Sequence, residues 1–213
     1  MGPFISLSGV VGSSCEDVER AVASFAAERG GRFDAVSDLM EIDWLERACL
    51  AAAGDKVSFL HPDWFEHGDA ISKHLSAVLG RAVFSFHIYN GEWWTFTLFS
   101  HGAEVTEFDP WQKYLDELSE DQRKKVGGDA AAVCAHVPGL SPDSIERYFV
   151  IWSKDVRTGG GKAYPDDENP YGDYSQMFDF MKRVGFVYPD VFDPSDGTKY
   201  RLRLPHPALP KKP

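Results

Sequence analysis

The residue types best suited to metal chemistry gather in the segment HPDWFEH, residues 61–67. Its potential ligands are His61, Asp63, Glu66 and His67. Imidazole and carboxylate groups suit zinc and iron, but this spacing corresponds to no established ligand motif. The proline and tryptophan inside the segment are typical of a loop before a helix. We therefore predict no metal site here, and we expect no cofactor.

Nucleophilic catalysis would need a serine or cysteine within hydrogen-bond reach of a base. His87, His101 and His136 are available as bases, but no G-x-S-x-G sequence marks a nucleophile. The glycines before Lys162 lack the rest of a phosphate-binding loop. We therefore assign no catalytic residue. Because chain order does not exclude a triad assembled in space, the alternative is a small hydrolase or metal-dependent enzyme with its site near His87 and residues 61–67.

A second group of ionisable residues lies in the Gly-, Pro- and Tyr-rich segment 157–174. Its carboxylates belong to Asp166, Asp167, Glu168 and Asp173, and its tyrosines include Tyr164, Tyr171 and Tyr174. The spacing is not that of an EF-hand calcium loop. We expect instead an exposed acidic loop that meets a basic partner protein, with the tyrosines providing contact area.

Large aromatic residues are concentrated between Val83 and Phe108, in the segment VFSFHIYNGEWWTFTLFSHGAEVTEF. Asn90-Gly91 predicts a two-residue hairpin turn, because both central residues of such a turn take positive φ. His101-Gly102 predicts a second turn. The first turn would pair Ile88 with Trp93, and neither face of the hairpin would then be plainly polar.

Most of these aromatic side chains are expected in the core, beneath different helices on the two faces. The residues predicted to be almost fully buried are Phe86, Ile88, Phe96 and Leu98. Tyr89, Trp93 and Trp94 lie beside the first turn, and we predict that they anchor a partner, because Trp and Tyr are favoured at interfaces.

Helices and strands are predicted on both sides of this hairpin. The helices are residues 14–29 behind a Ser13 or Ser14 cap, residues 69–79 with Asp69 as cap, and residues 175–184 before Gly185. The segment MEIDWLERACLAAAG, residues 40–54, has a helix-forming composition, and we expect a helix there. Strands are predicted at residues 3–11, 56–60, 147–153 and 200–204.

Composition narrows the class of protein. The net charge of −11 disfavours a nucleic-acid partner, which would need a basic face. No apolar run reaches the roughly 20 residues of a membrane span, so no membrane partner is expected. The start of the chain lacks the basic and apolar regions of a signal peptide, and the three cysteines are unpatterned. We therefore expect a cytoplasmic protein.

Two runs of the sequence resemble a group of uncharacterised bacterial cytosolic proteins. They are LSAVLGRAVFSFHIYNGEWWTFTLFSHGAEVTEFDP and YPDDENPYGDYSQMFDFMKRVGFVYPD. The shared features are a short helix ending LS-x-x-L, an aromatic hairpin of the form HDGDLW and a late YPDDE…Q-x-x-DFM segment. His87 and Trp93 or Trp94 match the hairpin, whereas Asn90-Gly91 stands where an acidic residue is commoner. The resemblance spans much of the chain from Leu75 to Asp190 and implies no known activity; likeness to immunity proteins is an analogy of general type.

Together these observations predict an α+β protein with a mainly antiparallel sheet of about five to six strands, helices packed on it and a helical C-terminal segment. Residues 1–110 would form the sheet with the aromatic hairpin. Residues 111–213 would add the helical segment, the acidic loop and a basic Pro-rich tail to the same domain. The predicted function is a non-enzymatic, immunity-like or regulatory module that binds another protein. The oligomeric state is left open.

Overall fold

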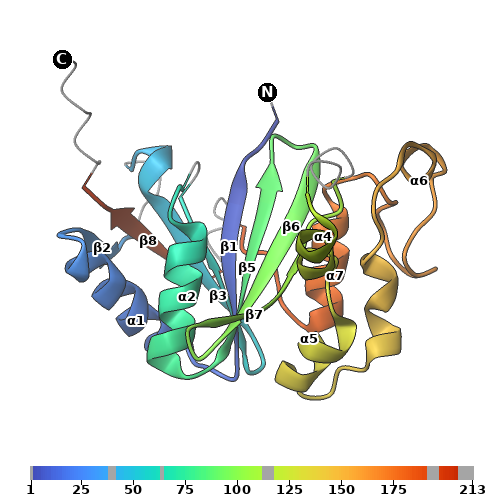
Figure 1. Cartoon of the computed structure of the whole chain (residues 1–213). Coiled ribbons are helices and arrows are strands. Elements are labelled where there is room, and N and C mark those ends of the chain that lie inside the picture. Colours follow the sequence, from blue (N-terminus) through green and yellow to red (C-terminus); the bar gives the residue numbers. More distant parts are fainter. Residues whose placement is uncertain (1, 38–41, 63–64, 112–117, 191–196, 206–213) are drawn as a thin grey trace, which may run out of the picture.

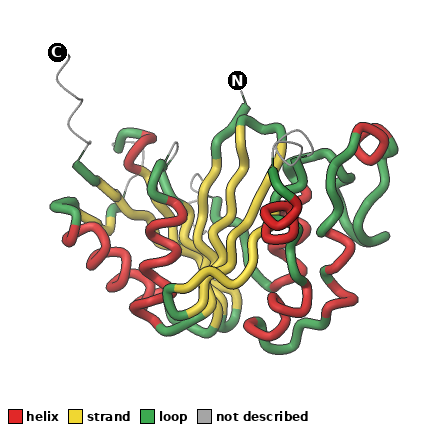
Figure 2. Tube along the Cα trace, in the orientation of Figure 1, coloured by secondary structure: helices red, strands yellow, loops and turns green. Residues whose placement is uncertain are grey.

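The computed structural model describes residues 2–37, 42–62, 65–111, 118–190 and 197–205. They form one eight-stranded sheet with helices against both faces (Figures 1 and 2). The strand order is β2-β8-β3-β4-β1-β5-β6-β7, and every neighbouring pair is antiparallel. The α+β class and the antiparallel sheet are confirmed. The expected number of five to six strands was wrong: Arg47–Ala53, in the region predicted as a helix, is a strand, and so is Arg32–Ala35, where no strand was predicted.

The bounds of the elements are as follows. The strands are β1 (Ile5–Val11), β2 (Arg32–Ala35), β3 (Arg47–Ala53), β4 (Lys56–Leu60), β5 (Ala82–Tyr89), β6 (Trp93–Ser100), β7 (Ala103–Phe108) and β8 (Thr198–Arg203). The helices are α1 (Cys15–Glu28), α2 (Gly68–Leu79), α4 (Glu120–Lys125), α5 (Ala130–His136), α6 (Lys154–Thr158) and α7 (Gln176–Val184). Short 3-10 turns cover Trp44–Glu46, Pro142–Ser144 and Glu146–Tyr148.

The predicted helix at residues 40–54 is replaced by a 3-10 turn and strand β3 over its described part. Strand β3 lies between β4 and β8, and Ala48, Cys49, Leu50 and Ala51 are all buried. Pairing on both edges therefore outweighs the helix propensity of Leu and Ala. The reverse error occurs at residues 147–153, predicted as a strand, where Tyr148 and Trp152 enter the core from a 3-10 turn and irregular backbone.

The strand predicted at residues 200–204 is present as β8. It lies between β2 and β3 rather than at an edge of the sheet. Residues from the end of the described chain thus pair with residues from its first quarter. The N- and C-terminal regions consequently share one sheet.

The turn of the aromatic hairpin has three residues rather than two. Asn90 and Gly91 have the expected positive φ values of 53° and 63°, but Glu92 also belongs to the loop. Tyr89 therefore pairs with Trp93, and Ile88 pairs with Trp94. A shift of one residue reverses which face each side chain of β6 occupies, so the predicted pairing of Ile88 with Trp93 was wrong.

With this register the hairpin has one entirely apolar face. Its members Phe84, Phe86, Ile88, Trp94, Phe96 and Leu98 are each at most 1% exposed. Helix α7 packs on this face, and its Phe180 ring stacks on Phe96 at a centroid distance of 5.2 Å. The predicted burial of Phe86, Ile88, Phe96 and Leu98 is confirmed.

Helices α1 and α2 cover the opposite face of the sheet, side by side in Figure 1. Val22 and Phe25 of α1 and Leu75 of α2 are fully buried against a second apolar cluster that includes Val57 and Phe59 of β4. Ser14 caps α1 by accepting a hydrogen bond from the Asp17 amide, as one of the two predicted caps requires. The two faces are therefore covered by different helices, as expected.

Candidate functional site

The face of β5, β6 and β7 that looks toward α2 is polar for much of its length. Cross-strand pairing places Ser85 opposite Thr97, and Thr97 opposite Glu107. In the next row His87 lies opposite Thr95. We call these five residues the polar face. The pairing predicted from the sequence hid this polar face. It differed by one residue from the observed register, and it therefore placed aromatic residues of β6 on the same face as Ser85 and His87.

An aromatic row continues from the polar face at the tip of the hairpin. It consists of Tyr89, Trp93 and Trp111, whose rings stack at centroid distances of 5.2 Å and 4.6 Å. The guanidinium carbon of Arg157 on α6 lies 4.8 Å from the Trp111 ring centroid. Tyr89 is 36% exposed and Trp93 is partly exposed. Two of the predicted anchors therefore present aromatic surface to solvent.

Trp94 is different, because it points to the apolar face. It is fully buried, and its indole nitrogen lies 3.4 Å from Oε1 of Gln176 on α7. This corrects the expectation that Trp94 contacts a partner. Trp111 takes the place that the sequence analysis gave to Trp94; a tryptophan directly after Asp109-Pro110, at the end of β7, was the available signal.

Two carboxylates with raised pKa values lie on the β7 side of this surface. Burial raises the pKa of Glu107 to about 7, and the nearby charges of Glu104, Asp109 and Asp69 add to the effect. Burial also raises the pKa of Asp109 to about 6, against a hydrogen bond from the Trp111 amide that acts to lower it. Both carboxylates are therefore partly removed from water, and no cation among the described residues compensates for the lost hydration.

His87 brings together a serine and an aspartate, the residue types of a hydrolase triad. Its Nε2 atom lies 3.0 Å from Ser85 Oγ and 2.9 Å from Asp69 Oδ1. A catalytic triad uses the two ring nitrogens for different partners, so that one fixes the imidazole while the other takes the serine proton. Here one nitrogen faces both partners, and Ser85 is fully buried. The arrangement orders the histidine but does not activate the serine.

A second imidazole lies deeper on the same face. His61 is 2% exposed, with Ser6 Oγ 2.8 Å from Nδ1 and Ser8 Oγ 2.8 Å from Nε2. Ser8 also lies 2.8 Å from the hydroxyl of Ser72 on α2. Burial lowers the pKa of His61 well below its ordinary value, and the charge of His87 acts in the same direction against an opposing effect of Asp69. The imidazole is therefore neutral at pH 7.

His61, the first potential metal ligand of the segment 61–67, is thus engaged by other side chains. Both of its ring nitrogens lie against serine hydroxyls, and His67 stands at the start of α2. Asp63 lies outside the described residues. Across the parts of the chain that are described, no three His, Cys, Asp or Glu side chains are arranged to hold a metal ion. The serines were missed by the sequence analysis, although their alternation in ISLS of β1 was visible.

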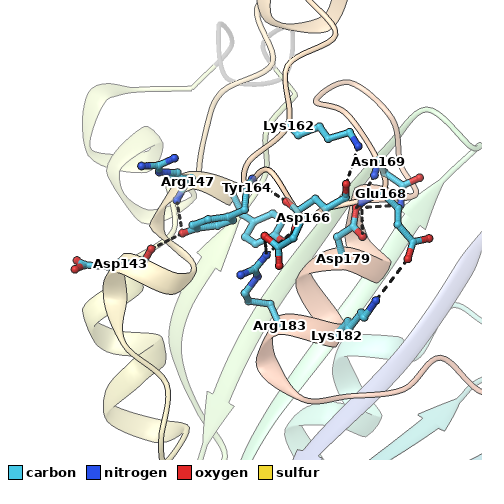
Figure 3. Close-up of polar contacts among 12 residues, drawn as sticks. Asp143, Arg147, Lys162, Tyr164, Asp166, Glu168, Asn169, Asp179, Lys182 and Arg183 are labelled. Atoms are coloured by element: carbon cyan, nitrogen blue, oxygen red, sulfur yellow. Dashed lines mark hydrogen bonds and ion pairs between the residues drawn. The ribbon is translucent and has the colours of Figure 1, made fainter.

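The acidic loop is held in place by internal contacts rather than free (Figure 3). Asp167 is 6% exposed, and its carboxylate accepts hydrogen bonds from the Tyr148 hydroxyl at 2.7 Å and the Tyr164 amide at 3.0 Å. Arg183 on α7 bonds both Asp166 and Asp167. This corrects the expectation that Asp167 meets a partner, because it is a buried structural group.

The other residues of the acidic loop are more accessible. Asp166 and Glu168 are exposed, and Glu168 forms an exposed ion pair with Lys182. Tyr164 and Tyr171 are partly exposed, but their hydroxyls donate to the backbone oxygens of Asp143 and Arg147. Asp173 accepts a hydrogen bond from the Ser175 amide just before α7. The loop is thus fixed, with charged atoms left at its surface.

A cavity of about 320 Å³ joins the two predicted binding regions. It is lined by Gly91 at the hairpin tip, Arg157 on α6 and residues 170–174 of the acidic loop. The aromatic row, Arg157 and this cavity form a continuous surface, since Arg157 contacts both. The hairpin tip and the acidic loop are far apart in the sequence, so their proximity was not predicted.

The fold and this surface define an α+β domain with an acidic, aromatic end to one sheet face. No family model matches the chain, and no curated protein or solved structure shows significant similarity to it. Within the described ranges, none of the helices has the length and apolar character needed to cross a membrane.

Proposed function

We propose that the protein is a non-enzymatic binding module that takes a cationic segment of a partner protein. The segment binds where the aromatic row meets Glu107 and Asp109. The observation that carries this proposal is the pair of raised carboxyl pKa values beside exposed aromatic rings.

The chemistry of this surface suits an arginine or lysine side chain. A cation over the face of an aromatic ring is attracted by the ring quadrupole, and Arg157 already takes that position on Trp111. Because Trp93 is stacked between Tyr89 and Trp111, the ring that a second cation meets is Tyr89, the most exposed of the row. A second cation would also stabilise the ionised forms of Glu107 and Asp109, which burial now disfavours. The ligand therefore supplies the charge that the site lacks.

The net charge of the protein also favours a basic partner. A chain of net charge −11 attracts a basic protein over distances longer than direct contact, which raises the rate of association. The proposal places the protein in the cytoplasm with an immunity-like or regulatory role, in which it sequesters its partner. The three cysteines are free thiols, which suits a reducing compartment.

A peptide pair tests the proposal. One peptide alternates arginine with glycine, and the other carries citrulline, which has the shape of arginine without its charge. Calorimetry should show binding of the arginine peptide alone, weakened on raising the salt from about 50 to 500 mM. Affinity should rise from about pH 6 to pH 8, because binding favours loss of the protons from Asp109 and Glu107.

Variants separate this site from the general acidity of the protein. Trp93→Ala and Glu107→Gln should each weaken binding about tenfold or more, by loss of the ring on which Tyr89 stacks or by loss of a carboxylate. The matched controls are Trp44→Ala, at an exposed tryptophan before β3, and Glu16→Gln, at an exposed acid on α1. Equal losses in all four variants, or equal binding of the citrulline peptide, would disprove a specific site.

A further inference from the structure

The cavity between the hairpin tip and the acidic loop differs from the surface around Glu107 and Asp109, because it holds a cation, Arg157, as well as a carboxylate, Asp173. Its volume of about 320 Å³ is near the lower end for small-molecule sites. The lining residues come from three separate segments, at Gly91, Arg157 and 170–174. A ligand of this cavity must therefore suit a guanidinium, two phenol rings, a proline and the carboxylate of Asp173.

Arg157 is the cation of this cavity. Among the described residues no carboxylate forms an ion pair with Arg157, although the protein carries an excess of acids. Its guanidinium is positioned instead by the Trp111 ring, at 4.8 Å. Gly172 backs the same side chain, since a Cβ at Gly172 would lie 3.0 Å from Cγ of Arg157. A guanidinium held against a ring keeps its N–H donors available for an anion.

The other polar side chains of the cavity divide into two that have hydrogen-bond partners and one that has none among the described residues. Tyr171 is fixed, because its amide donates to Gly161 O and its hydroxyl donates to Arg147 O. Asp173 is engaged with the Ser175 amide at 2.8 Å. The hydroxyl of Tyr174, by contrast, has no hydrogen-bond partner within the described part of the chain. The cavity thus offers one guanidinium and one free phenol.

We propose that this cavity binds a small organic acid, with the carboxylate on Arg157 and Tyr174 and a flat apolar body against Tyr171 and Pro170. A guanidinium pairs with a carboxylate through two parallel hydrogen bonds, and a phenol can donate a third. A monocarboxylate is favoured over a phosphate dianion, because the cavity holds a single guanidinium and the carboxylate of Asp173 disfavours a second negative charge. Binding here does not require the cation-binding surface, so either proposal can fail alone.

The probes are benzoate and benzamide, which share a shape but differ in charge. Amide chemical shifts of Gly91, Arg157 and Gly172 are followed by NMR during titration of each compound to about 20 mM, a weak-binding range. Benzoate should produce saturable shifts at these three residues. Benzamide should bind at least about tenfold more weakly, because it cannot form the charged pair with the guanidinium.

Two variants locate the anion. Arg157→Gln should abolish the preference for benzoate over benzamide. Tyr174→Phe retains the ring and should weaken benzoate about threefold to tenfold without affecting benzamide. The matched control is Arg29→Gln, which removes another guanidinium stacked on a ring, that of Phe25 at 3.6 Å; it should leave benzoate binding unchanged. Thermal unfolding and the remaining amide shifts verify that each variant is folded.

Three results would overturn the proposal. They are equal affinity for the two probes, unchanged benzoate affinity in folded Arg157→Gln, or shifts that stay linear throughout the titration. Unfolding of Arg157→Gln would leave the decision to Tyr174→Phe, in which an unaltered benzoate affinity also contradicts the site.

Discussion

The carboxylate of Asp69 on α2 lies 2.9 Å from Nε2 of His87 on β5. This contact crosses from the first turn of the helix to the polar face of the sheet. Asp69 was predicted to cap α2, but the helix begins at Gly68 behind His67, and no side chain caps it. The carboxylate is therefore available to the sheet. It fixes the orientation of His87 and adds negative charge beside Glu107.

Asp69→Asn should reduce stability slightly at neutral pH and not at all in strong acid. Burial acts to raise the pKa of Asp69, but the hydrogen bond and charge of His87 outweigh it, and the pKa lies below its ordinary value. A depressed carboxyl pKa stabilises the folded state above the unfolded pKa of about 4, and that stability is lost as pH falls through the folded value. Because the Asp69 side chain is 61% exposed, the unfolding free energies of the wild type and of Asp69→Asn should differ by less than about 1 kcal/mol.

Urea unfolding of both proteins at about pH 6.5, 4.5 and 3 measures this difference. The difference in unfolding free energy between the two proteins should be similar at the two higher pH values and should narrow at the lowest, because the folded-state pKa of Asp69 lies below its ordinary value. A difference that does not narrow at the lowest pH would mean that the amide side chain is costly at this position for a reason other than lost charge.

The adjacent tryptophans Trp93 and Trp94 should respond very differently to truncation. Trp94→Ala leaves a large cavity under α7, and it should lower the free energy of unfolding by about 3–5 kcal/mol. Trp93→Ala removes a partly exposed ring from the aromatic row, and it should cost less than about 2 kcal/mol. Chemical denaturation of the two variants gives the comparison. Equal losses would contradict the register that places these residues on opposite faces.

The sequence predicted the turn of this hairpin but not its length. Asn90-Gly91 correctly indicated positive φ. The loop nevertheless takes a third residue, and its Gly91 amide donates to Pro3 O at 2.9 Å. A Cβ at Gly91 would lie 2.7 Å from Pro3 Cδ, so the start of the chain packs closely on the turn. Such contact between distant segments is not encoded in the dipeptide, yet it accompanies the register that defines the polar face.

Strand β3 illustrates a second limit. Its sequence RACLAAA has the composition of a helix, and local propensity gives no reason to expect a strand. Its hydrogen bonds come from β4, which is adjacent in sequence, and from β8, about 150 positions later in the chain. By contrast α1 and α7 were predictable, because each carries its own apolar periodicity and terminal signals. The candidate site depends on long-range pairing, so only its individual aromatic and acidic residues could be anticipated.

Neighbouring acids of the loop provide another matched comparison. Asp167→Ser should destabilise the protein by about 3 kcal/mol, because it strips three hydrogen bonds from a buried carboxylate site and leaves Arg183 with one fewer partner. Asp166→Ser should leave stability unchanged, since that side chain is 74% exposed. Denaturant unfolding distinguishes the two variants.

Joint replacement of Asp166, Asp167 and Glu168 by Ser should therefore lower stability through Asp167 alone. An acidic loop exposed at all three of these residues, as the sequence predicted, would instead tolerate the joint replacement without loss of stability. A triple variant that unfolds at the same denaturant concentration as the wild type would contradict the structural role of Asp167.

The carboxyl group of Glu107 should make the protein less stable as pH rises toward 7. Its pKa is about 7 in the folded protein and near 4.5 when unfolded. Between these values the folded state holds a proton that the unfolded state has released, so stability falls with rising pH. The groups whose charges act on Glu107 are Glu104, Asp109 and Asp69, all acidic, so none reverses this sign.

Glu107→Gln removes this titration, and it should stabilise the protein by about 1–2 kcal/mol at pH 8, after allowance for partial solvent exposure, and by nothing at pH 4. Thermal unfolding of both proteins across this pH range supplies the measurement. The control is Glu16→Gln on the exposed side of α1, which should show no such pH dependence. Equal stability of Glu107→Gln and wild type at pH 8 would show that the carboxylate is already solvated, and the cation-binding surface would then lose its main support.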